Sequence, residues 1–340
     1  MSTVVERIAA AVLGAGGPAV GVQGLGCMGM SHAYGPTDGD EARATLERAL
    51  ELGITLFDTA DMYGSGENER FLAPFFAAHR DEVVIATKFA ISLDPGDPTK
   101  RAIRNDRPYL RACVEASLRR LGVEAIDLYY MHRRDPAVPI EETVGAMAEL
   151  VAEGKVRHLG LSEVTGAELR AAHAVHPIAA LQSEWSLFSR DVERSAVPAA
   201  RDLGVAMVPY SPLGRGFLTG AFKDASGELA ADDFRRHQPR FNGANAEANA
   251  ALLAPIRGVA EAHGATLGQI ALAWVQQQAL TRDMTVIPIP GTRRRTRLEE
   301  NAAATRITLT ASDLATLDEI APRVAGDRYP DMSFTAASRE

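Results

Sequence analysis

The chain has 340 residues, of which 46% are hydrophobic and 24% are charged. This balance is ordinary for a globular protein and supplies enough apolar material for a large core. The net charge of −8 argues against a general nucleic-acid binder, because contact with phosphate backbones usually requires a basic face. Two cysteines, Cys27 and Cys113, are too few for a disulfide framework and favour a reducing compartment. The N-terminal sequence lacks a signal-peptide pattern and no apolar run could span a bilayer, so we expect a cytoplasmic protein without membrane partners.

A hairpin is the first predicted element, because residues 7–13 and the segment from Ala19 onward flank a Gly14-Ala-Gly-Gly17 turn. Downstream, short apolar runs with little polar alternation are typical of strands buried on both faces. These runs cover residues 20–25, 54–58, 83–87, 126–131, 156–161, 179–182, 206–209 and 285–289. Helix-compatible stretches lie between them, among them residues 41–52, 107–121, 143–153 and 195–203.

Eight strands alternating with helices predict one domain over residues 1–340, an α/β fold of the (β/α)8 TIM-barrel type, with the N-terminal hairpin closing its bottom. An open doubly wound sheet is the competing interpretation, since Gly24-x-Gly26-x-x-Gly29 matches a dinucleotide-binding fingerprint. That motif needs a helix directly after it, but Gly35-Pro36 follows within a few residues. The strand count also favours closure, so we interpret the match as coincidental.

The connection after the seventh strand is unusually long and covers residues 213–249. Loops beyond about 15 residues are usually functional or disordered. On a barrel this loop would lie over the active-site face, so we expect a lid for a cofactor or a substrate. A merely tolerated insertion is the alternative.

Ionisable side chains follow three successive predicted strands. Asp58 ends the second strand with Tyr63 in the loop after it, Lys88 ends the third, and His132 ends the fourth. Barrel enzymes carry their chemistry at the carboxyl ends of strands, so these four groups are expected to converge.

The residue types fit the reduction of a carbonyl group, which needs a proton donor at oxygen. A tyrosine has an ordinary pKa of about 10 and is a reluctant donor or base, and a nearby ammonium lowers that pKa. We expect Lys88 to supply the ammonium, Asp58 to pair with it, and His132 to orient the substrate oxygen. Tyr63 would be the general acid in reduction and the base in oxidation. Each residue alone has a structural explanation, as a helix cap, a packing aromatic, an ion-pair member or a barrel-end histidine. Their order at strand ends favours catalysis.

Several motifs together resemble the aldo-keto reductase superfamily, from the hairpin to about Asn301. They are Phe57-Asp-Thr-Ala-Asp-Met-Tyr63-Gly, Thr87-Lys88, Met131-His132, Gly160-Leu-Ser162, Gln182-Ser-Glu-Trp185, Tyr210-Ser-Pro-Leu-Gly-Arg-Gly-Phe-Leu-Thr-Gly220 and Ile289-Pro-Gly-Thr-Arg293 with Glu300-Asn301. The spelling of several of these motifs is similar to that in a bacterial, fungal and plant branch of the superfamily, which includes pyridoxal reductases. The resemblance implies NADPH as cofactor, a small-molecule carbonyl substrate and no metal.

No dinucleotide-binding βαβ unit is present, so the resemblance implies a cofactor extended over the barrel mouth. Ser162 and Gln182 would hydrogen-bond the nicotinamide carboxamide, and Trp185 would stack on the ring, with core packing as its alternative. The diphosphate would lie near glycines whose lack of Cβ permits close approach. The full set of expected cofactor contacts is Gly29, Met30, Ser162, Gln182, Trp185, Tyr210, Ser211, Pro212, Leu213, Gly214, Arg215, Gly216, Gly291, Thr292, Arg293, Arg297, Glu300 and Asn301.

Four arginines in residues 293–297 follow the last strand and open a helix. Helix N-termini attract phosphate and arginine binds it bidentately, which points to the 2′-phosphate of NADPH. By resemblance, Thr292, Arg293 and Arg297 would contact that phosphate, and Glu300 and Asn301 the adenine. A solvated basic helix start is the alternative.

The sequence departs from the family pattern at two positions. Trp185 stands where tyrosine is common, and Glu163 stands where much of the family has asparagine. A carboxylate cannot donate to the carboxamide oxygen, so a nicotinamide contact by Glu163 is in doubt.

Two functions other than carbonyl reduction stay open. One is a regulatory NADPH-binding subunit resembling potassium-channel beta subunits, which share the four residues. The other is a dehydrogenase that oxidises alcohols. The chain lacks a long N-terminal extension, which favours a free enzyme, as a monomer or a homo-oligomer. Substrate specificity is expected from residues 28–34, from Phe89 onward, and from residues 234–242 and 329–334, whose aromatic and apolar side chains favour a hydrophobic carbonyl compound.

Overall fold

The computed structural model describes residues 6–31, 33–35, 37–94 and 97–340. Its first elements, β1 (Ala10–Val12) and β2 (Ala19–Gly21), pair antiparallel and confirm the predicted hairpin. Leu13 and Val20 are buried within the cluster of side chains that fills the barrel. Gly14 lies against Ala179 at the start of a barrel strand, where an added Cβ would come within 2.2 Å of the Ala179 carbonyl oxygen. The hairpin therefore closes the barrel at the amino ends of its strands, as predicted.

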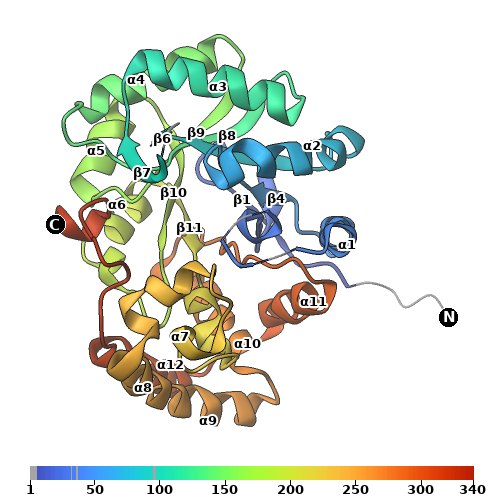
Figure 1. Cartoon of the computed structure of the whole chain (residues 1–340), viewed down its shortest axis with the longest axis vertical. Helices are drawn as coiled ribbons and strands as arrows, with labels where there is room; N and C mark the ends of the chain where they lie inside the picture. Colours follow the sequence, from blue (N-terminus) through green and yellow to red (C-terminus); the bar gives the residue numbers. More distant parts are fainter. Residues whose placement is uncertain (1–5, 32, 36, 95–96) are drawn as a thin grey trace.

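A seven-stranded parallel sheet forms the barrel wall, in the order β11-β10-β9-β8-β5-β4-β3 (Figure 1). Its strands are β3 (Leu25–Gly26), β4 (Leu56–Asp58), β5 (Val84–Phe89), β8 (Ile126–Met131), β9 (Val156–Ser162), β10 (Ile178–Glu184) and β11 (Ala206–Tyr210). The predicted first strand over residues 20–25 is wrong in its bounds. Residues 19–21 belong to the hairpin, and only Leu25 and Gly26 pair with β4.

The predicted eighth strand closes the gap between β11 and β3 without being a continuous strand. Isolated parallel bridges join Met207 to Val286 and Gly26 to Gly291. Between them, Pro288 and Pro290 have no N–H to donate, which interrupts the ladder. The Pro288 carbonyl still accepts from the Gly24 amide at 3.0 Å. The sheet is thus nearly closed, and the (β/α)8 fold predicted from the sequence is confirmed.

Helices surround the sheet (Figure 1). They are α1 (Gly39–Glu51), α2 (Glu67–Ala78), α3 (Arg107–Leu121), α4 (Ile140–Ala152), α5 (Gly166–Val175), α6 (Ala196–Leu203), α9 (Leu253–His263), α10 (Leu267–Arg282), α11 (Arg295–Ala303) and α12 (Ala311–Asp318). Strand residues alternate between the two sides of the wall. Tyr130 points into the barrel, whereas Tyr129 packs in the layer between strands and helices and stacks on Phe89. Among the described residues, no helix is long and apolar enough to cross a membrane.

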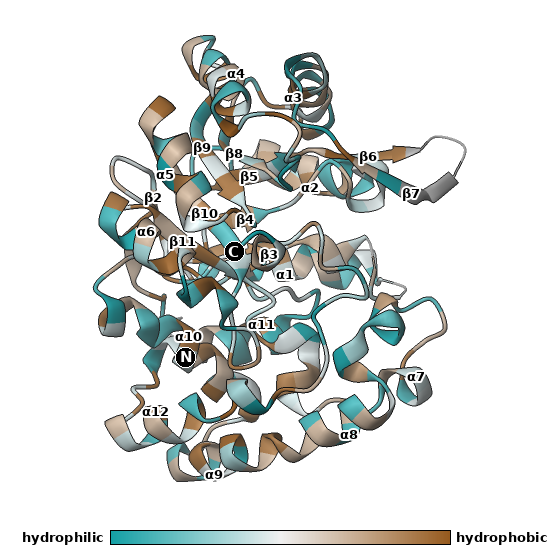
Figure 2. Ribbon diagram, turned by 90° about the vertical axis from the view of Figure 1, so that its left-hand side faces the viewer, coloured by the Kyte–Doolittle hydropathy of each residue, from teal (hydrophilic) through white to brown (hydrophobic). Residues whose placement is uncertain are grey.

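Two excursions leave the barrel at the carboxyl ends of its strands. The hairpin of β6 (Ile91–Asp94) and β7 (Asp97–Ile103) follows β5, extends beside α2 (Figure 2), and was not predicted. The long connection after β11 carries short helices, among them α7 (Ala225–Glu228) and α8 (Gly243–Ala251). It reaches the first loop, where the Phe234 and Tyr34 rings meet edge to face at 5.2 Å. Two residues of that first loop lie outside the described residues. They are His32, in the segment expected to affect specificity, and Pro36 of the Gly35-Pro36 pair.

Candidate active site

Asp58 and Lys88 form a buried ion pair at the carboxyl ends of β4 and β5. The Lys88 Nζ donates to Asp58 Oδ1 at 2.5 Å and to the Thr59 carbonyl oxygen at 2.7 Å. Burial lowers the pKa of Lys88 from its ordinary 10.5, against the opposing effect of Asp58. The predicted pairing of these two residues is confirmed. Gln182 on β10 also donates to Asp58, through Nε2 to Oδ2 at 2.7 Å, which gives this amide a partner that was not predicted.

Tyr63 lies beside this pair, with the Lys88 Nζ 5.3 Å from its ring centroid. Gly64 and Gly66 adopt positive φ directly after it, which lets the chain turn sharply from β4 into α2. The expected lowering of the Tyr63 pKa by Lys88 is wrong. Burial, followed by the charge of Asp58, raises the pKa of Tyr63 well above 10.0. Because burial and then Asp58 disfavour the phenolate, the phenol keeps its proton, and it can act as a proton donor rather than as a base.

His132 follows β8 and lies next to Tyr63, with the two ring centroids 6.0 Å apart and nearly perpendicular. Its backbone N–H donates to the Phe89 carbonyl oxygen at 2.8 Å, which anchors it at the barrel mouth. Burial, then Arg133 and Lys88, lower the pKa of His132 well below 6.5. The imidazole is therefore neutral and carries one N–H. Its Nδ1 is buried and has no hydrogen-bond partner among the described residues.

Arg133, which is not among the predicted site residues, connects His132 to the expected nicotinamide end of the site. Its Nη1 donates to the His132 carbonyl oxygen at 2.7 Å and to Ser162 Oγ at 3.3 Å. Its guanidinium carbon lies 5.9 Å from the ring centroid of Tyr210. Ser162, at the end of β9, and Tyr210, at the end of β11, are thus brought together around one side chain. The two arginines directly after Met131-His132, Arg133 and Arg134, were the sequence feature that could have pointed to this residue.

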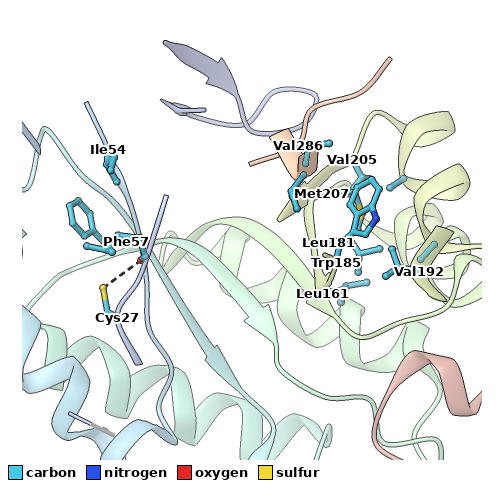
Figure 3. Packing of buried hydrophobic residues seen from close by; sticks show 14 of the residues in the cluster. Cys27, Ile54, Phe57, Leu161, Leu181, Trp185, Val192, Val205, Met207 and Val286 are labelled. Atoms are coloured by element: carbon cyan, nitrogen blue, oxygen red, sulfur yellow. Dashed lines mark hydrogen bonds between the residues drawn. The ribbon is translucent and has the colours of Figure 1, made fainter. Parts of the chain in front are cut away.

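Trp185 does not join this group. It is 0% exposed and packs among Leu161, Leu181 and Met207 in the layer outside the strands (Figure 3). Its Nε1 donates to Glu193 Oε1 at 2.9 Å. The predicted stacking of Trp185 on a nicotinamide is inconsistent with this placement, because both the ring and its polar atom are already enclosed by protein. Core packing, the alternative interpretation, describes its position.

Glu163 is the centre of a buried charge cluster that holds the C-terminal tail. It is 1% exposed and adopts a φ of +50° just beyond β9. Arg328 donates to both of its carboxylate oxygens, at 3.0 and 3.2 Å, and the Ala336 amide donates to one of them at 3.1 Å. Burial alone would raise the pKa of Glu163, but Arg328 and then Arg133 outweigh it and lower the pKa to about 2. Its carboxylate is therefore committed to the tail.

The tail also covers the end of β11. The Tyr329 hydroxyl accepts from Arg215 Nη2 at 2.6 Å and lies 3.4 Å from the Tyr210 hydroxyl. The Tyr329 and Phe334 rings meet edge to face at 4.9 Å. The tail segment expected to affect specificity therefore lies at the barrel mouth.

The segment after β11 turns back on itself beside the mouth. Residues 211, 214, 215 and 216 all have positive φ, and the Gly216 amide donates to the Leu213 carbonyl oxygen at 3.0 Å. Pro212 and Gly214 are buried, whereas Ser211, Leu213 and Gly216 are half-buried. The Arg215 side chain points inward and pairs with Glu184 at 3.2 Å. The cation of Arg215 therefore already has a protein partner.

Arg293, predicted to contact a phosphate, holds the first loop. Its guanidinium donates to the carbonyl oxygens of Gly29, Tyr34 and Gly35 and to Thr37 Oγ1, all within 3.1 Å. These bonds use Nη1 and Nη2 and tie Arg293 to the first loop, and its contact with a phosphate stays a prediction.

The other arginines near the start of α11 differ in how far they are engaged. Arg295 pairs with Glu41 through its backbone N–H and its guanidinium. Arg294 is exposed, and the Arg297 side chain is 57% exposed while donating to Glu300 at 2.6 Å. Arg294, Arg295 and Arg297 are thus all exposed, but Arg295 is held through both its backbone and its guanidinium by Glu41.

The remaining predicted cofactor residues lie on the same face or at its edge. Gly291 is exposed at its bridge to Gly26, and Thr292 Oγ1 accepts from the Arg294 amide at 3.2 Å. Gly29 is half-buried, and the Met30 side chain packs into the core. Glu300 accepts from Thr266 at 2.8 Å, and Asn301 is buried. Among the described residues, no cluster of histidine, cysteine or acidic side chains is arranged to hold a metal ion.

The mouth of this α/β barrel holds a neutral phenol, a buried lysine–aspartate pair and a neutral imidazole. Together these groups define an oxidoreductase site suited to proton transfer at oxygen. The chain belongs to the aldo/keto reductase family, whose model matches residues 24–322. It is 44% identical over 321 residues to a probable aldo-keto reductase of Glycine max, an alignment that covers 93% of this chain and 90% of that protein.

Solved structures agree with this assignment. A glycerol dehydrogenase from Gluconobacter oxydans superposes with a TM-score of 0.81 at 29% identity, covering 97% of this chain and 99% of its own. The holo form of an aldo-keto reductase from Bacillus halodurans superposes with a TM-score of 0.75 at 25% identity, covering 96% and 100%. The family uses nicotinamide cofactors, and the protein is an oxidoreductase of this type.

Proposed function

We propose that the protein reduces aldehyde or ketone groups to alcohols with NADPH, as a single-domain cytoplasmic enzyme, with Tyr63 as the general acid. The observation that carries this proposal is the neutral Tyr63 phenol beside the Lys88–Asp58 pair and the neutral His132. A buried phenol with a raised pKa keeps its proton until a stronger base, such as a developing alkoxide, forms next to it.

Each of the four residues has a separate task in this proposal. Tyr63 transfers its proton to the substrate oxygen, and the single N–H of His132 hydrogen-bonds and orients that oxygen. Lys88 stabilises the tyrosinate that remains, since its ammonium lies over the phenol ring. Asp58 holds Lys88 charged in surroundings that would otherwise favour the neutral amine. Tyr63 then regains its proton from solvent.

The residues at the barrel mouth fit a nicotinamide dinucleotide, which supplies the hydride when bound. Ser162 and Gln182 would hold the carboxamide, and Tyr210 is the aromatic side chain next to them, in place of the enclosed Trp185. The turn over residues 211–216 presents backbone to a diphosphate. The 2′-phosphate of NADPH would be held by Arg294 and Arg297 at the start of α11, where cations and helix amides attract anions.

The oxidising direction is a second candidate, because the superposing protein from Gluconobacter oxydans is described as a glycerol dehydrogenase. The same residues serve it with the proton moving from the alcohol to Tyr63. We propose reduction as the main activity and test both.

A panel of aliphatic and aromatic aldehydes and ketones with purified protein and NADPH tests the proposal, alongside alcohols with NADP+. Consumption of NADPH with at least one carbonyl compound is expected. A protein that binds NADPH but turns over no compound in either direction would contradict the enzymatic proposal and favour a regulatory subunit.

A further inference from the structure

Arg133 is a buried cation at the barrel mouth, next to the proposed active-site residue His132. Arg133 is 7% exposed, and both hydrogen bonds from its Nη1 go to neutral oxygens. Its Nε has no hydrogen-bond partner, and it forms no ion pair, among the residues that the structure describes. Buried charges are normally paired, because removing an ion from water is costly unless an opposite charge replaces the solvent.

The other buried charges around the mouth balance one another. Lys88 pairs with Asp58, Arg328 with Glu163 and Asp191, and Arg215 with Glu184. His132 is neutral because burial and its cationic neighbours lower its pKa. Arg133 differs from these cations, because no carboxylate lies within ion-pair distance of it in the described part of the chain and Glu163 acts on it only from farther away.

The surroundings of Arg133 suit a small organic molecule. Its guanidinium carbon lies 5.9 Å from the Tyr210 ring centroid and 5.6 Å from that of Phe334 on the tail. Its charge also acts at the reacting groups, since Arg133 contributes to lowering the pKa of His132 and opposes the raised pKa of Tyr63. A compound placed with its carbonyl group between Tyr63 and His132 would extend past these aromatic rings toward the guanidinium.

We infer that Arg133 is an anion subsite of the active site, and that the substrate is an aldehyde or ketone that also carries a carboxylate. This inference rests on the proposed carbonyl reduction. A carboxylate matches the planar fork of donors on a guanidinium and accepts from the Nε that the protein leaves without a partner. It also supplies the missing counter-charge, so its affinity gains from the low exposure of the site.

The test compares each of 2-, 3- and 4-carboxybenzaldehyde with its neutral carboxamide analogue, which has nearly the same shape. The measured quantity is the ratio of kcat/KM for the acid to kcat/KM for the amide, so general losses of activity cancel. We expect at least one isomer to be preferred over its amide by about tenfold or more, the size of one charge-assisted hydrogen bond. Arg133→Met should reduce that ratio to near one, and Arg133→Lys should restore part of it.

Arg134→Met is the matched control, because Arg134 is the next residue, is similarly buried and has Glu168 near its guanidinium at 3.7 Å. It should keep the wild-type ratio. A binding measurement independent of turnover uses terephthalate, a dicarboxylate without a reducible group. Its affinity for the wild-type protein should exceed that for Arg133→Met by about tenfold, while the affinity for NADPH stays similar.

Two results would overturn the inference without touching the proposed function. One is turnover of benzaldehydes with no acid preferred over its amide. The other is an Arg133→Met variant that loses NADPH affinity while its acid-to-amide ratio is unchanged, which would assign Arg133 to the cofactor. Absence of turnover with every compound would instead contradict the carbonyl reduction itself.

Discussion

Removing Arg328 tests whether the buried charge cluster holds the tail over the barrel mouth. Arg328 is 3% exposed and donates to both oxygens of Glu163, which is 1% exposed. The pKa of Glu163 falls from an ordinary 4.5 to about 2 because Arg328, followed by Arg133, outweighs the effect of burial. At about 1.4 kcal/mol for each tenfold change, this corresponds to about 3 kcal/mol in favour of the folded, ionised state. Losing one partner of a buried pair typically costs about 3–5 kcal/mol.

We therefore expect Arg328→Met to lower the free energy of unfolding by about 3 kcal/mol or more at pH 7, measured by urea titration. Arg43→Met is the control, because its side chain is 62% exposed and its partner Asp40 is almost fully exposed. It should stay close to the wild type. The double variant Glu163→Gln/Arg328→Met should recover part of the loss, since it no longer buries an unpaired charge. An Arg328→Met midpoint equal to that of Arg43→Met would refute this reasoning.

Three further predictions concern Glu163, Trp185 and Arg297. Because the folded pKa of Glu163 lies below its unfolded pKa, the stabilisation by Glu163 is present above about pH 4.5 and is lost as the pH falls toward 2. The Glu163→Gln variant should therefore lack this pH dependence of the unfolding free energy in urea titrations between those pH values. Trp185→Phe should lose about 1–2 kcal/mol of stability, because it leaves a cavity and breaks the hydrogen bond to Glu193. Its NADPH affinity should stay within twofold of the wild type in fluorescence titrations, and a large loss of affinity would favour stacking of Trp185 on the nicotinamide. Arg297→Ala should weaken NADPH binding by about tenfold and NADH binding little, and equal weakening of both would contradict a 2′-phosphate contact.

The sequence predicted those parts of the fold that depend on local patterns. The strand over residues 126–131 and the helix over residues 107–121 have the predicted bounds. The strand is a continuous apolar run. The helix is preceded by Asp106, whose side chain accepts from the Tyr109 amide, and is followed by Gly122 with a positive φ. Asp58 and Lys88 were also placed correctly, because the carboxyl ends of neighbouring parallel strands meet at one face.

What could not be predicted depends on contacts between distant segments. Whether Trp185 points into the mouth or into the outer layer depends on how the chain turns after β10, which the pattern does not reveal. The bonds by which Arg293 holds the first loop were not predicted, because their acceptors lie more than 250 residues earlier in the chain. The raised pKa of Tyr63 depends on burial and on the charge of Asp58, neither of which the local sequence pattern determines. The role of Glu163 could not be predicted, because its partner Arg328 lies on the tail that folds back over it.

Turnover of Tyr63→Phe tests the central claim most directly, because this change removes one hydroxyl and keeps the ring that packs at the mouth. With a carbonyl compound that the wild type reduces, kcat should fall by about 10²–10⁴-fold, the usual contribution of a general acid. NADPH affinity, measured by fluorescence on the same preparations, should stay within about twofold. Turnover close to that of the wild type would contradict the assignment of Tyr63 as the proton donor.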